Sequence, residues 1–338
     1  MGIMGTAIDP ASDRRLAAAL DAARAASRAI AAVGDPQALT PGSVVEKGAA
    51  GPATVADLAS QAAIVIALRR SLGEGVEIVA EENLEEAESL GGAALVARAH
   101  SAFAASGIDA GEASFRDALA SCAGEGGVSA FWTVDPLDGT KGYLRGGQFA
   151  VAIALVERGR PVLGVLAAPR LGVDGSGPGD GILAVAIDGL GAVQSPLASW
   201  SPRPLRAHPW SPGDAVRVAG SVEKAHSSSD SLEARAAALG PVDPVRIDSQ
   251  AKYALVARGD ADCYVRLSPS AGYRECIWDH AAGAVIARES GAVVTDAAGR
   301  ALDFSCGRRF RDSSGIVCAP PRLHESLVRL LAGAGSAG

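Results

Sequence analysis

Residues 132–143, WTVDPLDGTKGY, limit the possible folds of this chain more than any other segment. Residues 131–134 favour a short buried strand, and Pro136 cannot donate a hydrogen bond to a strand ladder. The strand is therefore expected to end in a tight turn that carries Asp135 and Asp138. Both carboxylates could then face one cation.

Similar chemistry is expected at other strand ends and helix starts. Gly139 lets the backbone approach a ligand, and a helix that begins near Thr140 would direct free N–H groups at an anion. A short strand at 76–79 runs into Glu81, and Asp279 opens a helical pattern that continues to residue 290. These two acids and the two aspartates of the turn are hard oxygen donors without cysteine or paired histidine beside them. Such a set favours Mg²⁺ over zinc or copper.

Each of these acids also has an ordinary structural interpretation. Asp-Pro and Asp-Gly pairs are usually turns, and Glu81 lies in an acidic run that is typical of a solvated face. Asp279 could be the N-cap of the helix that follows it. Acids that converge on one point repel one another and require cations. Their convergence would therefore support the metal site.

Length and composition limit the class of protein. The 338 residues allow one large domain or two closely packed domains with a sizeable core. The net charge of −7 argues against a nucleic-acid or anionic-membrane partner, and the longest apolar run, 149–156, is shorter than the ~20 residues of a membrane helix. Five cysteines without CxxC spacing favour a reducing compartment. The acidic N-terminal segment lacks a targeting pattern, so a cytoplasmic location is expected.

The pattern of elements changes at the proline-rich segment 196–212, the best candidate for a domain boundary. Before it we expect helices at 13–33 and 54–73, a loop at 39–52, a helical insertion at 83–127, and antiparallel strands at 148–156, 161–168, 182–187 and 191–194. After it we expect strands at 216–218, 244–247, 261–267, 292–295 and 315–318, alternating with helices at 229–239, 249–258, 279–290 and 323–331. This alternation predicts an α/β half with a mostly parallel sheet.

Three motifs give the chain a resemblance to a known family: DPLDGTKGYLRG at 135–146, RIDSQAKY at 246–253 and GYRECIWDH at 272–280. They resemble the 3'(2'),5'-bisphosphate nucleotidases, especially the plant and algal type, within the inositol monophosphatase superfamily of magnesium-dependent, lithium-sensitive phosphatases. The resemblance implies a layered αβαβα sandwich of combined α+β and α/β class. An N-terminal α+β domain (1–200) would carry most metal ligands, and a C-terminal α/β domain (201–338) would carry the nucleotide-binding residues.

The resemblance also implies a metal centre and the residues that form it. Two or three Mg²⁺ ions would be bound by the main-chain carbonyl of Leu137 and by the carboxylates of Glu81, Asp135, Asp138 and Asp279. Asp57 and Thr140 would position and deprotonate the attacking water. Without the resemblance, Asp57 could merely stabilise the helix dipole, an effect of ~0.3–1 kcal/mol.

Substrate contacts are implied in the same way, from residues that match those with which relatives hold adenosine 3',5'-bisphosphate. The implied contacts are Thr140, His226, Ser249, Lys252, Arg266 and Asp279. Three of them have ordinary alternatives when considered alone. Ser249 could cap the helix that contains Lys252, Arg266 could pair with any surface acid, and His226 could lie in a solvated loop.

The implied function is hydrolysis of the 3'-phosphate of adenosine 3',5'-bisphosphate (PAP) to AMP and phosphate by a metal-activated water. The sulfated precursor PAPS is a second candidate substrate, and the reaction belongs to sulfur assimilation. Alternatives are an inositol polyphosphate 1-phosphatase, an inositol monophosphatase, or a non-catalytic protein that senses the nucleotide. The expected partner is a small-molecule nucleotide, with no nucleic acid and no membrane, and the chain is expected to be a monomer.

Overall fold

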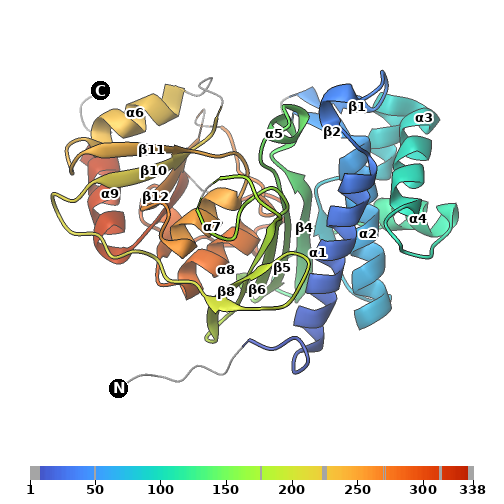
Figure 1. Ribbon diagram of the computed structural model, residues 1–338, viewed down its shortest axis with the longest axis horizontal. Helices are drawn as coiled ribbons and strands as arrows, with labels where there is room; N and C mark the ends of the chain where they lie inside the picture. Colours follow the sequence, from blue (N-terminus) through green and yellow to red (C-terminus); the bar gives the residue numbers. More distant parts are fainter. Residues whose placement is uncertain are drawn as a thin grey trace.

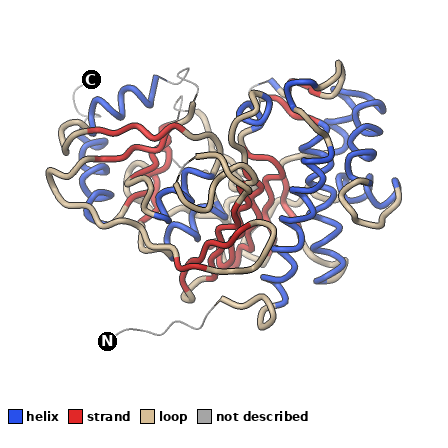
Figure 2. The backbone as a smooth tube through the Cα atoms, in the orientation of Figure 1, coloured by secondary structure: helices blue, strands red, loops and turns tan. Residues whose placement is uncertain are grey.

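The chain folds into alternating layers of helices and sheets, which a computed structural model describes for residues 8–48, 51–175, 177–222, 227–268, 270, 272–311 and 314–333. In order, the layers are the N-terminal helices, a seven-stranded sheet, two central helices, a five-stranded sheet and two outer helices. Figure 1 shows the N-terminal helices on the right and the five-stranded sheet on the left. Figure 2 shows helices between the strands of the two sheets. The predicted αβαβα sandwich is confirmed.

The first layer contains α1 (Arg14–Ala32), α2 (Val55–Leu72), α3 (Leu84–Ala104) and α4 (Glu112–Ala120). Buried alanines occupy much of α1 and α2, and their small side chains let the two helices pack closely along their length. The carboxylate of Asp13 accepts hydrogen bonds from two N–H groups of the first turn of α1. The helix therefore begins where the sequence predicts it.

The second layer is a sheet with the strand order β3-β4-β5-β6-β7-β8-β9. Strands β3 and β4 are parallel, and every later pair is antiparallel. The bounds are β3 (Ile78–Ala80), β4 (Phe131–Asp138), β5 (Ala150–Glu157), β6 (Arg160–Ala168), β7 (Ile182–Ile187), β8 (Gly191–Pro196) and β9 (Arg203–Pro204). The predicted antiparallel hairpins are confirmed.

Both faces of this sheet are covered, so its strands are apolar on both sides. Along β5, Val151 and Ile153 belong to the core cluster shared with α1 and α2, whereas Ala152 and Ala154 belong to the cluster shared with the central helices. The central helices approach closely because the residues facing them are small. A Cβ added to Gly164 of β6 would lie 2.5 Å from a methyl group of Val285.

One sequence prediction about this sheet is wrong. We expected the strand to end before Pro136, but β4 continues through it to Asp138. The pairing with β5 shifts register between Asp135 and Asp138, so Pro136 lies in a bulge where no ladder hydrogen bond is required of it. The short helix α5 (Thr140–Leu144) follows directly, after Gly139 with a left-handed φ of 87°.

The central layer consists of α7 (Ala251–Arg258) and α8 (Ala281–Glu289). The next sheet has the order β11-β10-β12-β14-β13, and α6 (Ser227–Ala236) and α9 (Pro321–Gly333) cover its outer face. Its strands are β10 (Val216–Gly220), β11 (Val242–Arg246), β12 (Cys263–Leu267), β13 (Val293–Asp296) and β14 (Gly315–Ala319).

This second sheet is more mixed than the sequence predicts. The two pairings made by β10 are parallel, but both pairings of β14 are antiparallel. The predicted loop at 39–52 contains β1 (Val44–Glu46), paired antiparallel with β2 (Pro52–Thr54) after the 3-10 turn η1 (Pro36–Ala38). No helix among the described residues is long and apolar enough to cross a bilayer.

Candidate active site

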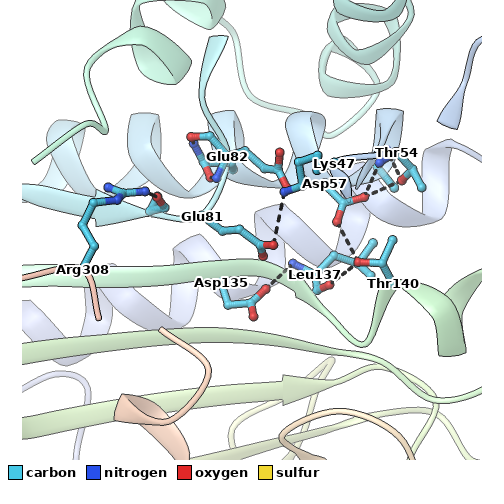
Figure 3. Close-up of polar contacts among 12 residues, drawn as sticks. Lys47, Thr54, Asp57, Glu81, Glu82, Asp135, Leu137, Thr140 and Arg308 are labelled. Atoms are coloured by element: carbon cyan, nitrogen blue, oxygen red, sulfur yellow. Dashed lines mark hydrogen bonds and ion pairs between the residues drawn. The ribbon is translucent and has the colours of Figure 1, made fainter. Parts of the chain in front are cut away.

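The parallel pairing of β3 and β4 brings two of the predicted metal-binding segments together. The N–H of Glu81, just after β3, donates a hydrogen bond of 3.2 Å to the carbonyl of Val134 in β4. In Figure 3 the Glu81 side chain extends toward Asp135 and Leu137, and Asp57 lies on the same side near Thr140. Residues from α2, from the end of β3, from β4 and from α5 thus face the same region.

Asp57 is buried in the first turn of α2, where its Oδ2 completes a capping box. This oxygen accepts hydrogen bonds from the N–H and the hydroxyl of Thr54, at 2.8 Å and 2.6 Å. The other oxygen, Oδ1, lies 3.2 Å from the hydroxyl of Thr140. Burial raises the pKa of Asp57 to about 6, although the hydrogen bond from Thr54 opposes the shift. The helix cap therefore fixes the orientation of Asp57 toward Thr140.

Asp135 and Asp138 face the same region from the bulge of β4. The Oδ1 of Asp135 accepts a hydrogen bond of 3.1 Å from the N–H of Leu137. Burial and then the charges of Glu81 and Asp138 raise the pKa of Asp135 well above its ordinary value. Asp138 accepts a hydrogen bond from the N–H of Gln250, the residue before α7, so a segment from the C-terminal half of the chain contacts this turn. Burial also raises the pKa of Asp138.

Asp279 approaches this cluster from the segment that precedes α8. His280, and not Asp279, occupies the N-cap position, and its side chain makes no capping hydrogen bond. The ordinary N-cap interpretation of Asp279 is therefore wrong. Burial raises the pKa of Asp279 to about 7, with the charge of Arg266 opposing the shift. Asp279 also contributes to the raised pKa of Asp135, which places it within electrostatic reach of the acids on β4.

The acids that converge here are suited to a hard divalent cation. Buried carboxylates raise one another's pKa when no cation is near, as Asp135 shows. A bound cation would reverse this effect by favouring the ionised forms. All side-chain donors of the predicted set are carboxylate oxygens, the ligands that Mg²⁺ prefers. The residues present therefore fit the predicted magnesium centre.

Lys47 is a member of the site that the sequence analysis missed. It follows β1, and its side chain is 3% exposed, with Nζ 2.7 Å from a carboxylate oxygen of Glu82 and 3.3 Å from one of Glu81 (Figure 3). Burial lowers the pKa of Lys47, but Glu82 and Glu81 together raise it above its ordinary value. The residue lay in a segment that we expected to be a loop. The adjacent acids Glu81 and Glu82 do not by themselves indicate Lys47, because the need for a counter-charge arises from the burial of Glu82 in the fold.

The predicted nucleotide contacts lie mainly around the start of α7. Lys252 is buried, with its Nζ 3.1 Å from the carbonyl of Ser249 and 5.5 Å from the centre of the Tyr264 ring. Burial lowers the pKa of Lys252 to about 8, and Asp138 opposes the shift. Gln250 holds the N-cap position of α7 without a side-chain cap, and Ser249, with a left-handed φ of 71°, precedes it. The hydroxyl of Ser249 accepts a hydrogen bond of 3.2 Å from the N–H of Ala251, so Ser249 does satisfy one N–H group at the start of the helix.

Arg266 also faces the cluster, at the end of β12. Its guanidinium lies 3.0 Å from the buried carboxylate of Glu275 and 3.6 Å from that of Asp279. The alternative of a pair with a surface acid is therefore wrong, because Glu275 is fully buried. His226, the remaining predicted contact, lies outside the described residues.

Comparison with known proteins identifies the family of this chain. The profile of the inositol monophosphatase family matches residues 12–336, nearly the whole chain. The chain belongs to the inositol monophosphatase family. This family is generally metal-dependent, typically with Mg²⁺. The resemblance that the three sequence motifs indicate is confirmed.

Several relatives in this family carry the name of one activity. The 3'(2'),5'-bisphosphate nucleotidase of Emericella nidulans is 37% identical over 327 residues, which cover 84% of this chain and 88% of the relative. The protein of the same name from Oryza sativa is 38% identical and covers 85% of each chain. The 3',5'-bisphosphate nucleotidase 2 of Arabidopsis thaliana is 35% identical, over 94% of this chain and 95% of its own.

Solved structures of family members share the fold at lower identity. The IMPase of Thermotoga maritima has a TM-score of 0.65 and 20% identity, with 95% of this chain and 98% of that chain covered. CysQ from Bacteroides thetaiotaomicron has a TM-score of 0.57 and 22% identity, with 90% and 97% covered. The fold class predicted from the sequence is confirmed by these structures as well.

Proposed function

We propose that this chain is a magnesium-dependent 3'(2'),5'-bisphosphate nucleotidase that hydrolyses the 3'-phosphate of PAP to give AMP and phosphate. The names of the relatives from fungi and plants support the substrate class. The observation that carries the proposal is the position of Asp57 and Thr140 near the acids that follow β3 and end β4, with the cations Lys252 and Arg266 beside Asp138 and Asp279. This arrangement combines a site for water activation with a site for an anionic substrate.

The metal ligands in this proposal are the carbonyl of Leu137 and the carboxylates of Glu81, Asp135, Asp138 and Asp279. Two or three Mg²⁺ ions are proposed. When bound, they would supply the positive charge that makes a water acidic and that neutralises the leaving oxygen. The convergence of these acids supports this assignment, because burial and then the charges of neighbouring acids raise their pKa values, and a cation would favour the ionised forms.

Asp57 and Thr140 are proposed to act on the attacking water. The Thr140 hydroxyl can donate its single proton to Oδ1 of Asp57, which leaves its lone pairs free to accept a hydrogen bond from water. Asp57 would then accept the proton released through Thr140. The water attacks phosphorus directly, so no covalent bond to Thr140 is formed.

The 5'-phosphate of the substrate is proposed to contact Lys252 and Ser249, with His226 and Arg266 as further contacts, while Thr140 and Asp279 lie at the 3'-phosphate. Lys252 is suited to this role because it is held in place by Ser249 and by the Tyr264 ring. Its ammonium group has been partly desolvated by burial, so an arriving phosphate would interact with it strongly. PAPS, which also carries this phosphate, is proposed as a second substrate.

Phosphate release tests the proposal directly. The purified chain is assayed in Mg²⁺ with PAP, PAPS, adenosine 3'-phosphate, inositol 1-phosphate and inositol 1,4-bisphosphate, and Asp135→Asn gives the background. The expected result is the highest kcat/KM for PAP. A preference for either inositol phosphate would overturn the nucleotide assignment. Tight binding of PAP without turnover would indicate a sensor instead of an enzyme.

Three further features belong to the proposal. We propose a division into domains 1–200 and 201–338, although β9 adds residues 203–204 to the edge of the first sheet. A cytoplasmic location is supported by the five cysteines, which are all free thiols. We also propose a monomer, which light scattering of the purified chain would test.

A further inference from the structure

Arg308 connects the two segments that deliver Glu81 and Asp279, although it belongs to neither. Its main chain is fixed to the segment before Asp279. The N–H of Ile277 donates a hydrogen bond of 3.1 Å to the carbonyl of Arg308, and the N–H of Phe310 donates one of 3.0 Å to the carbonyl of Glu275. The guanidinium lies 4.7 Å from the centre of the Trp278 ring, next to Asp279 in the chain.

The side chain of Arg308 then reaches the end of β3 (Figure 3). Its Nη2 donates a hydrogen bond of 2.6 Å to the carbonyl of Ala80, the residue before Glu81. Its Nη1 donates to the carbonyls of Gly124 at 3.2 Å and Cys122 at 3.4 Å. A planar guanidinium can hold several acceptors in a fixed arrangement, which a lysine ammonium does less well.

The end of β3 needs such support. The strand has three residues and lies at the edge of the sheet. Its outer side is bound by the segment 122–124 through an isolated bridge between Val79 and Ala123. Arg308 holds this segment and β3 together at the point where the chain leaves the sheet to form Glu81.

We propose that Arg308 is a positioning residue that fixes Glu81 relative to Asp279 and so raises the affinity of the acidic cluster for divalent cations. This role presupposes the metal centre of the proposed function. The charge of Arg308 and its hydrogen bonds predict opposite effects of its removal on the affinity for cations. A positive charge near a cation site weakens cation binding, so loss of the charge alone would tighten it. Loss of the hydrogen bonds to Ala80 and its neighbours would weaken it.

Binding of Mn²⁺, followed by calorimetry and by electron paramagnetic resonance, tests this role without depending on substrate. Mn²⁺ is a suitable probe because it prefers the same oxygen ligands as Mg²⁺. We expect Arg308→Ala and Arg308→Lys to raise the Kd for Mn²⁺ about tenfold, which corresponds to ~1.4 kcal/mol. The lysine variant keeps the charge, so the same direction of change in both variants assigns the effect to position.

Arg258 supplies a matched control. Its guanidinium also binds main-chain carbonyls across the molecule, those of Gly172, Val173 and Gly175, at 2.9, 3.3 and 2.7 Å. It lies at the last turn of α7, away from the acids of the site. Arg258→Ala should therefore lower the melting temperature and leave the Kd for Mn²⁺ within twofold of the wild type.

Several results would overturn the role of Arg308. These are an unchanged or tighter Kd in both Arg308 variants, an equal weakening in Arg258→Ala, or a wild-type chain that binds no Mn²⁺. Should the alanine variant not fold, the lysine variant alone gives the answer. A wild-type chain that binds Mn²⁺ but hydrolyses none of the nucleotides would refute the proposed function, and weakened binding in the Arg308 variants would still support the positioning role.

Discussion

The hydroxyl oxygen of Thr140 lies 3.2 Å from Oδ1 of Asp57, although the two residues are 83 positions apart. The capping box of α2 holds the other oxygen of Asp57, so the carboxylate cannot turn away from Thr140 without losing a helix cap. The Thr140 oxygen is also 3.2 Å from the carbonyl of Leu137, a proposed metal ligand. The hydroxyl of Thr140 therefore contacts both the first turn of α2 and the end of β4.

If Asp57 and Thr140 act on one water, their substitutions should not be additive. Asp57→Asn and Thr140→Val are each expected to lower kcat by about 10²–10⁴-fold, the usual contribution of proton transfer by a positioned group. The double variant should lose about as much as either single variant, because one unit has been broken in each case. Steady-state kinetics at saturating Mg²⁺ measure this. Losses that multiply would show that the two residues act independently.

Asp135→Asn should separate catalysis from stability. Turnover is expected to fall below detection, because the substitution removes a proposed ligand at the centre of the cluster. The metal-free protein should become more stable at pH 8, since a buried charge repelled by its neighbours is lost. Phosphate release and thermal unfolding in EDTA measure the two effects. Glu85→Gln, at an exposed position of the nearby acidic run, is the control: it should leave turnover unchanged and, because Glu85 lies in the first turn of α3, lower the stability by no more than ~1 kcal/mol. Retention of most activity in Asp135→Asn would refute the assignment.

The raised pKa values also predict how stability depends on pH when metal is removed. The pKa values of Asp57 and Asp279 are about 6 and about 7 in the folded chain, above the ordinary value of 3.8. The folded state therefore keeps protons that the unfolded state has lost. The contribution of these two groups to the free energy of unfolding is therefore fully present below pH 3.8. It is lost as the pH rises through the folded-state pKa values of about 6 and about 7. We expect a loss on the order of a few kcal/mol between pH 5 and 8 in EDTA.

Magnesium should remove most of this loss, because it favours the ionised carboxylates that the metal-free site disfavours. Urea unfolding at pH 5, 6, 7 and 8, with EDTA or with saturating Mg²⁺, measures both curves. The stabilisation by Mg²⁺ should increase with pH. Equal stabilisation at pH 5 and pH 8 would contradict the convergence of these acids on a cation site.

Much of the candidate site could be predicted because its acids lie where a strand ends or a helix begins, and such boundaries leave a local signal in the sequence. Asp135 and Asp138 were indicated by the end of a strand, whereas the role of Asp57 at the start of a helix was implied only by the family resemblance. The prediction that the strand ends before Pro136 was wrong because a bulge can hold a proline inside a strand. Bulges depend on the pairing partner and cannot be predicted from the sequence of one strand alone. The direction of β13 and β14 was missed for a similar reason, since apolar runs do not specify parallel or antiparallel pairing.

Residues that act through distant contacts could not be predicted. Lys47 pairs with Glu82 because this buried carboxylate requires a counter-charge, and Glu82 becomes buried only once the chain has folded. Arg308 serves the end of β3 from more than two hundred residues away. Neither residue lies in a motif whose spacing predicts its contacts. The acids of the site have such motifs because each one lies at the end of its own element.

The last prediction concerns how the chain distinguishes a bisphosphate from a monophosphate. Lys252→Met keeps most of the side-chain volume but removes the ammonium proposed to contact the 5'-phosphate. A hydrogen bond to a charged group contributes about 1.5–3 kcal/mol, so kcat/KM for PAP should fall by roughly 10- to 150-fold. Adenosine 3'-phosphate lacks the 5'-phosphate, and its kcat/KM should change by less than about threefold, since only the general surroundings of the site are altered.

Lys141→Met is the control for a change of net charge. Lys141 is exposed on α5 beside the turn and has no assigned role, so its removal should affect both substrates equally and weakly. The ratio of the two kcat/KM values is the quantity to compare, because a general loss of folded enzyme cancels in it. A ratio that Lys252→Met leaves unchanged would show that Lys252 does not recognise the 5'-phosphate. The selectivity would then have to come from Arg266 or from other groups.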